Sequence, residues 1–103
     1  MPQAEFTAHH DEHESRLEVH GEIDLATAAS MVVALADVVA EAGSRRIVVD
    51  VGGVTFVDST GLKALIGAQI DLTAQRRLTL RNIPPHLQRV LEITSTVDLF
   101  DID

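Results

Sequence analysis

Residues 54–62 read Val-Thr-Phe-Val-Asp-Ser-Thr-Gly-Leu, and the fold of this 103-residue chain is decided around them. The stretch follows a continuous apolar run, Ile47–Val51, which predicts a central strand covered on both faces. It leads into a segment, about 60–75, whose apolar residues recur at helical spacing. Asp58, Ser59 and Thr60 therefore fall at a helix N-terminus, where free N–H groups and the helix dipole favour negative charge.

The N-terminal part of the chain predicts a β-hairpin. Residues 4–8 form a short strand candidate, and residues 16–20 alternate polar and apolar side chains as a half-buried strand does. The polar residues 9–14 between them are expected to form the turn. Gly21 is expected to end the second strand.

A long helix is expected over residues 25–42, with Asp24 as its N-cap and Gly43 as its C-cap. Spacings of four and three residues predict one buried stripe on this helix. The stripe consists of Ala28, Val32, Leu35, Val39 and Ala42.

The second half of the chain continues with alternating elements. Gly52-Gly53 is expected to form a turn before the chain resumes an extended path to Val57. Residues 78–80 predict a further strand, and Pro84-Pro85 predicts the start of a third helix. This order of elements predicts a single α/β domain over residues 1–103, with a mixed β-sheet, covering helices and right-handed crossovers.

Composition narrows the classes of function. The net charge of −8 opposes binding to nucleic-acid backbones, and three Phe without Tyr or Trp offer little for base stacking. The arginine pairs at 45–46 and 76–77 are interpreted as solvated charges flanking strands. The chain has no Cys, and its N-terminal residues lack the apolar core of a signal peptide. A cytoplasmic protein that does not insert into membranes is expected.

Most of the chain resembles the STAS domain of bacterial anti-sigma-factor antagonists. The segment 50–62 carries the strongest resemblance, and Gly21–Asp24 resembles the signature before the first helix of that family. Residues 83–91 resemble the third helix of that family, and Leu99-Phe100 resembles the apolar pair that closes its domain.

This resemblance implies a partner switch. The serine directly after the aspartate is the phosphorylation site of the family, which corresponds to Ser59, with Thr60 as the fallback hydroxyl. The unphosphorylated protein would bind an anti-sigma factor with serine kinase activity and so free a sigma factor. Phosphorylation would end that binding, and a phosphatase would restore it. The kinase would hold ATP and Mg²⁺, so no cofactor is expected on this chain.

Several residues are candidates for partner contact beside Ser59 and Thr60. Asp58 is expected to order the loop, and Gly61 is expected to leave the helix N-terminus unobstructed. Asp24 has either a capping role alone or a partner contact as well, because the resemblance implies that its loop shares a surface with Ser59. An arc of small and apolar residues on the second helix is expected to extend this surface: Lys63, Gly67, Ile70 and Ala74.

Three positions depart from the family pattern. Lys63 stands where many antagonists carry a small residue, Thr96 replaces a common glycine, and no clear terminal helix precedes Asp103. Lys63 bears on partner choice because it lies beside the candidate phosphosite.

Catalytic and metal-binding interpretations are weaker. Ser59 lies outside a G-x-S-x-G nucleophile elbow and has no evident base, so the chain is expected to be a substrate of a kinase and not an enzyme. His9, His10, Asp11 and His13 superficially resemble a metal cluster, but they fall in a polar turn without helical periodicity. Two alternatives remain open: a STAS subunit of a lipid-transport ATPase, or a small-ligand sensor.

Overall fold

A computed structural model describes residues 3–72 and 76–103, and it contains a mixed five-stranded sheet in the order β1-β2-β3-β4-β5. Strands β1 and β2 pair antiparallel, and the other neighbours pair parallel. The predicted hairpin and the predicted mixed sheet are therefore confirmed. The strands are β1 Ala4–His10, β2 Glu14–Ile23, β3 Arg46–Val57, β4 Thr79–Arg81 and β5 Asp101–Ile102. The helices are α1 Ala28–Ala42, α2 Ser59–Asp71, α3 Pro85–Ile93 and a 3₁₀ turn, Val97–Leu99.

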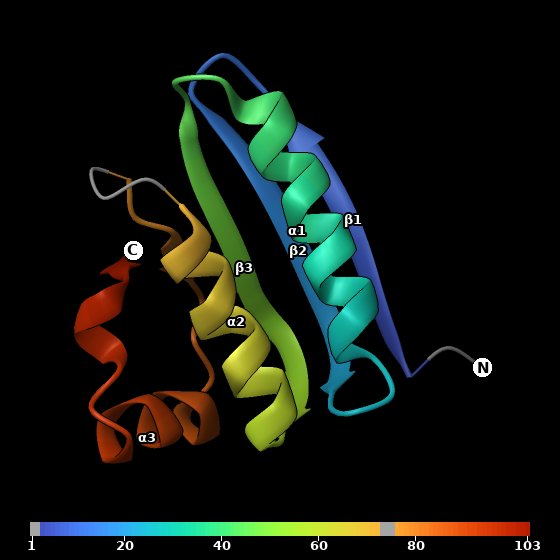
Figure 1. Cartoon of the computed structure of the whole chain (residues 1–103), viewed down its shortest axis with the longest axis vertical. Helices are drawn as coiled ribbons and strands as arrows, with labels where there is room; N and C mark the ends of the chain where they lie inside the picture. The colour runs from blue at the N-terminus through green and yellow to red at the C-terminus, as the bar shows by residue number, and fades with distance from the viewer. Residues whose placement is uncertain (1–2, 73–75) are drawn as a thin grey trace.

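Helices α1 and α2 lie side by side over one face of the sheet (Figure 1). Each is the crossover between two parallel strands, α1 between β2 and β3 and α2 between β3 and β4. The core between these layers is aliphatic. It includes Leu17 and Val49 from the sheet, Leu35 and Leu65 from the covering helices, and Leu91 from α3.

Two predicted breaks in strands are wrong, because both glycines allow close approach inside a continuous strand. Strand β2 runs on past Gly21, which has φ +96° and whose missing Cβ leaves room for the Gln3 carbonyl oxygen, 2.1 Å from that position. Strand β3 likewise runs through Gly52-Gly53 without a turn. A Cβ on Gly53 would lie 2.0 Å from Nδ1 of His20, so the glycine accommodates this ring.

The start of α1 also differs from its prediction. The helix begins at Ala28 with Thr27 as the N-cap residue, and Asp24 caps the turn before it. The expected C-cap, Gly43, is confirmed.

The buried stripe of α1 is rotated from the predicted one. Met31 and Val38 take the buried positions expected for Val32 and Val39, and Val32 is 42% exposed. The reason is that α1 packs on the sheet through Met31 and Val38, whereas Val32 and Val39 line the groove between α1 and α2. The buried stripe is Ala28, Met31, Leu35, Val38 and Ala42.

The C-terminal elements are partly as predicted. Helix α2 ends at Asp71, earlier than expected, and the predicted position of Ala74 lies outside the described residues. Strand β4 begins one residue later than predicted, and α3 starts at Pro85 as expected. Strand β5 and the 3₁₀ turn had no counterpart in the sequence prediction.

The two residues of the apolar pair Leu99-Phe100 differ in burial. Phe100 is 3% exposed and closes the core, whereas Leu99 is 39% exposed. Within residues 3–72 and 76–103, no helix has the length and apolar character needed to cross a membrane.

Candidate phosphorylation and partner-binding site

Asp58 joins two loops at the end of the sheet. It follows β3 and is the N-cap residue of α2, where its Oδ1 accepts a hydrogen bond of 2.8 Å from the Gly61 N–H. Its Oδ2 accepts a second one, of 3.3 Å, from the Leu25 N–H in the loop between β2 and α1. The expected ordering role of Asp58 is confirmed, and the structure adds that one carboxylate ties both loops together.

The Asp24 loop lies against the start of α2. The Asp58 N–H donates to the Ile23 carbonyl oxygen over 3.1 Å. Directly after Ile23, Oδ1 of Asp24 accepts hydrogen bonds from the Ala26 and Thr27 N–H groups at 2.9 and 3.2 Å. Asp24 is thus brought to the same end of the molecule as Ser59, as the resemblance implied, but it caps a turn and not α1 itself.

Ser59 is exposed at the first position of α2, and Thr60 beside it is half-buried. Among the hydrogen bonds of the described chain, none engages the Ser59 hydroxyl or the N–H groups of Ser59 and Thr60. Asp58 satisfies the next two N–H groups, those of Gly61 and Leu62. Free amide donors and the positive end of α2 therefore surround an accessible hydroxyl, and both favour an added anion.

Gly61 lies beneath this surface rather than on it. It is buried, and a Cβ at this position would lie 2.3 Å from the Ile23 carbonyl oxygen. Gly61 therefore lets α2 pack closely on the end of β2. It offers no side chain to a partner, and its place in the site is structural.

Three residues of the arc predicted on α2 are described by the structure, of which two are exposed and Gly67 is half-buried. Lys63 is exposed, Ile70 is 70% exposed, and Gly67 has open space where a Cβ would stand. With Ser59, these residues recur at spacings of four, four and three, so they follow one face of the helix. They form a strip that runs along α2 from the candidate phosphosite.

Two exposed apolar side chains near Ser59 were not predicted from the sequence. Leu25 is 79% exposed and its N–H bonds to Asp58, while Phe56 is 49% exposed two residues before Asp58. Exposed apolar side chains are typical of surfaces that bind another protein. The sequence carried no signal for this exposure, because apolar residues at a strand end and in a pre-helix turn usually pack inward.

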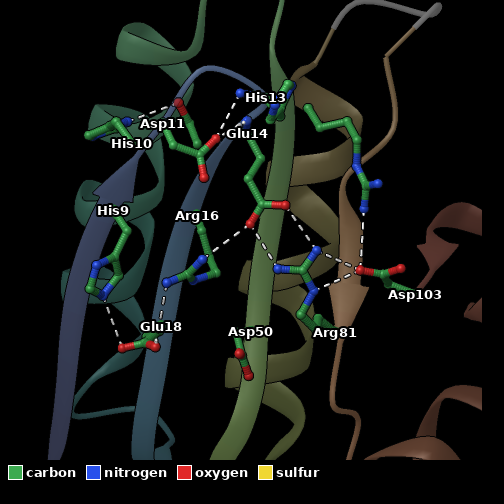
Figure 2. Close-up of polar contacts among 12 residues, drawn as sticks. His9, His10, Asp11, His13, Glu14, Arg16, Glu18, Asp50, Arg81 and Asp103 are labelled. Atoms are coloured by element: carbon green, nitrogen blue, oxygen red, sulfur yellow. Dashed lines mark hydrogen bonds and ion pairs between the residues drawn. The ribbon is translucent and has the colours of Figure 1, made fainter.

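The predicted turn at residues 9–14 is shorter than expected, since His9 and His10 end β1 and Glu14 begins β2, and its histidines make ordinary polar contacts. Nε2 of His9 lies 3.1 Å from Glu18, and Nδ1 of His10 lies 2.9 Å from Oγ of Ser15 (Figure 2). Oδ1 of Asp11 accepts hydrogen bonds from the His13 and Glu14 N–H groups, which lower the pKa of Asp11. Across the described ranges of the chain, no three His, Cys, Asp or Glu side chains are grouped closely enough to hold a metal ion.

A charged network covers the sheet face that points away from α1 and α2 (Figure 2). Glu14 accepts two hydrogen bonds from Arg81, at 2.8 and 3.0 Å, and one of 3.2 Å from Arg16. Arg81 also lies 2.6 Å from Asp103. The hydrogen bonds from Arg81, with a smaller contribution from Arg16, hold the pKa of Glu14 below its usual range.

The arginine pairs flank β3 and β4, and the side chains of Arg46 and Arg77 are 52% and 46% exposed, as expected for solvated charges, but the pairs also make contacts that were not predicted. Arg45 donates to the carbonyl oxygens of Ala42 and Asp11, and Arg76 donates to that of Arg45. Arg46 and Arg77 pair with the carboxylates of Asp103 and Asp101. These arginines fasten chain segments to one another.

Comparison with known proteins agrees with this geometry. A family model described as "Mlab, STAS domain" matches residues 6–100. The chain is 29% identical, over 85 residues, to a Bordetella bronchiseptica protein named "Putative anti-sigma factor antagonist BtrV", covering 82% of this chain and 72% of that protein.

Solved structures share the fold. An anti-sigma factor antagonist from Mycobacterium paratuberculosis matches with a TM-score of 0.84 and 26% identity, over 96% of this chain and 84% of that one. The antagonist SpoIIAA in its unphosphorylated form matches with a TM-score of 0.70 and 17% identity, over 96% and 87% of the two chains. The phosphorylated form of SpoIIAA, from Bacillus, matches with the same TM-score and 18% identity, over 96% and 91%. This chain belongs to the STAS family, and its fold is that of anti-sigma factor antagonists.

Proposed function

We propose that this STAS protein is an anti-sigma factor antagonist whose partner binding is switched off by phosphorylation of Ser59. The observation that carries the proposal is the position of Ser59: exposed, first in α2, and beside the joint that Asp58 makes between two loops. The named relatives support the antagonist role, and SpoIIAA is a protein of this fold with a phosphorylated form.

The proposed switch acts at the interface and not on the fold. A phosphate adds about −1.5 to −2 charges at neutral pH and strong acceptor oxygens. Free N–H groups at the start of α2 accommodate this charge locally. The surface around it still changes, because bulk and negative charge appear at the start of the strip from Lys63 to Ile70. Asp58, next to Ser59, also bonds to the loop of the exposed Leu25.

The partner in this proposal is an anti-sigma factor with serine kinase activity, which binds the unphosphorylated surface and transfers phosphate from ATP to the Ser59 hydroxyl. A phosphatase reverses the transfer by hydrolysing the phosphoserine. The partner is expected to place apolar side chains against Leu25 and Phe56. Lys63 gives this interface a cationic site that suits a carboxylate on the partner.

A second candidate function uses the same surface without phosphorylation. In the STAS subunit of a lipid-transport ATPase, the α2 edge would dock permanently on the ATPase. The observation that favours this second candidate is the match to a family model whose description names Mlab. Retention of the partner in the presence of ATP separates a permanent subunit from a switch.

The test uses the purified chain with each candidate partner, an anti-sigma factor with serine kinase activity or a lipid-transport ATPase. Wild type, Ser59→Ala and the matched control Thr60→Ala are incubated with the partner and ATP, and phosphate is mapped by mass spectrometry. Modification of wild type and Thr60→Ala, with none on Ser59→Ala, supports the proposal. Stable co-purification of an unmodified chain in ATP favours the permanent subunit, and modification elsewhere with Ser59 untouched contradicts the phosphosite.

The role of Asp24 is tested in the same binding assay. Asn accepts the turn hydrogen bonds about as well as Asp, so Asp24→Asn is expected to leave stability nearly unchanged. A charged partner contact predicts weaker binding for this variant. Equal affinity would leave Asp24 with the capping role alone.

A further inference from the structure

Helix α1 exposes an apolar ridge that the fold does not cover. Its solvent side carries Ala29, Val32, Val33, Ala36 and Ala40, all exposed, and we call these five residues the α1 ridge. Val32 and Val33 are 42% and 63% exposed, respectively. Ala29 and Ala40 are eleven positions apart, so the ridge is about 17 Å long at the rise of an α-helix.

The ridge stands between two surface hollows. A groove of about 250 Å³ separates α1 from α2, where Val32, Ala36 and Ala40 face Ala68 and Leu72. A second, more open hollow lies between α1 and β1, where Val33 and Ala29 approach Phe6. The alanines keep the ridge low, so a helix laid along the groove can approach closely, as helices do when ridges pack into grooves.

Carboxylates flank the ridge on both sides. Asp71 lines the groove toward α2, and Asp37 lines the hollow toward β1. Helix α1 carries a second acid, Glu41, and no Lys or Arg between Ala28 and Ala42. Arg45 and Arg76, which follow the two helices in sequence, donate to main-chain carbonyl oxygens.

We propose that the α1 ridge and its groove bind a basic amphipathic helix of a partner protein. An apolar stripe on that helix would cover Val32, Ala36 and Ala40, and Lys or Arg side chains beside the stripe would reach Asp37 and Asp71. This surface is separate from the strip of Ser59, Lys63, Gly67 and Ile70. It consists of the outer side of α1 and the side of α2 that faces α1. The inference therefore stands without the proposed switch.

The charges argue for this occupant over a second copy of the chain. Two copies packed through the ridge would bring two sets of Asp37, Glu41 and Asp71 together, and like charges across an interface are unfavourable. The net charge of −8 adds to that repulsion at long range and likewise opposes an anionic lipid surface. The same negative charge attracts a cationic partner.

The test measures binding of a fluorescent 18-residue helical peptide, with a Leu and Ala stripe flanked by Lys, by fluorescence anisotropy. Ala36→Glu is expected to weaken binding at least tenfold, because it places a charge in the apolar contact. Ile93→Glu is the matched control, because it adds the same charge to an exposed apolar side chain, 75% exposed on α3, that lines neither hollow. It is expected to leave the affinity within about twofold of wild type. Melting curves by circular dichroism check that both variants fold.

The charge requirement is tested separately. Asp37→Asn and Asp71→Asn are each expected to weaken binding about threefold and to flatten its salt dependence. A peptide with the same apolar stripe and Glu in place of Lys is expected to bind at least tenfold more weakly.

Three results would overturn the inference. One is equal binding of the Lys and Glu peptides, and another is an Ala36→Glu variant that binds as well as wild type. The third is self-association of the chain in analytical ultracentrifugation, or binding to phosphatidylcholine vesicles, that Ala36→Glu abolishes. That result would assign the ridge to a second copy or to a lipid surface.

Discussion

The outer face of the sheet and the end of the molecule that carries Ser59 differ in how many of their polar groups are hydrogen-bonded and in how many of their apolar side chains are exposed. On the sheet face, Glu14 binds Arg81 and Arg16, and Arg81 binds Asp103 in turn. At the Ser59 end, a hydroxyl and two amides stay free within the described chain, and Leu25 and Phe56 are exposed. The polar groups on the sheet face bind one another, whereas polar and apolar groups at the Ser59 end are available to bind a partner.

This difference separates stability from binding. A carboxylate that is hydrogen-bonded on several sides costs free energy when it is removed, because its partners lose their bonds. A free surface serine costs little to change, but it alters whatever binds there. Variants of the free groups near Ser59 should therefore change binding, whereas variants of hydrogen-bonded or closely packed groups, in either region, should change stability.

Gly61→Ala is expected to destabilise the protein by about 3 kcal/mol, because overpacking a close contact costs in this range. The added Cβ would meet the Ile23 carbonyl oxygen at 2.3 Å, and the main chain cannot easily move there. Gly67→Ala is the matched control on the same helix, since open space surrounds its Cβ position. It is expected to be neutral or to stabilise by up to about 1 kcal/mol. Urea unfolding measures both, and equal stability of the two variants would contradict the close packing of Gly61.

Glu14→Gln is expected to cost about 2 kcal/mol at neutral pH, in the range of hydrogen bonds to charged groups. Glu14 has a lowered pKa in the folded protein, so its stabilising effect is present above the usual pKa of glutamate, about 4.3. The effect fades as the pH falls below that value toward the folded pKa, and the gap between wild type and variant should narrow there.

The control for this network is Glu12→Gln, at an exposed position in the neighbouring turn. Urea unfolding at pH 7 and at pH 4 compares the variants. If the difference in free energy of unfolding between wild type and Glu14→Gln stays constant over this pH range and below it, Arg81 does not stabilise the charged form of Glu14.

Asp58→Ala is expected to cost about 1–2 kcal/mol, the range for loss of an N-cap. It also removes the acceptor for the Leu25 N–H, so amide exchange at Leu25 should accelerate. Asp58→Asn retains one acceptor oxygen and should recover most of the stability. Unchanged exchange at Leu25 in Asp58→Ala would contradict a joint between the two loops.

Ser59→Asp and Ser59→Ala are expected to change the free energy of unfolding by less than about 0.5 kcal/mol, as is usual for exposed positions. The carboxylate lies near the positive end of α2, so any small change for Ser59→Asp should be stabilising. Partner affinity should nevertheless fall for Ser59→Asp and persist for Ser59→Ala. A large loss of stability in either variant would show that Ser59 supports the fold.

Much of the architecture could be read from patterns that depend on neighbouring residues. The hairpin, the central strand after Arg46, the helix N-terminus at residues 58–60 and the proline start of α3 were predicted because periodicity, turn residues and capping act locally. The strip of Lys63, Gly67 and Ile70 along one face of α2 was also predicted, since helical spacing alone fixes which residues share a face.

Contacts between distant segments decided the rest. Gly21 and Gly53 looked like breaks in strands, but they accommodate Gln3 and His20, which lie close only after folding. The buried stripe of α1 could not be chosen from spacing, because two neighbouring faces of this apolar helix suit the pattern and only packing on the sheet selects one.

The sequence by itself determined an α/β chain with a hydroxyl at a capped helix N-terminus, because these properties follow from spacing and local hydrogen bonding. Tertiary structure alone decided that Asp58 reaches Leu25, that Glu14 binds Arg81, and that Leu25, Phe56 and the α1 ridge stay uncovered. Such contacts join residues up to 67 positions apart, and burial depends on which segments arrive beside each side chain.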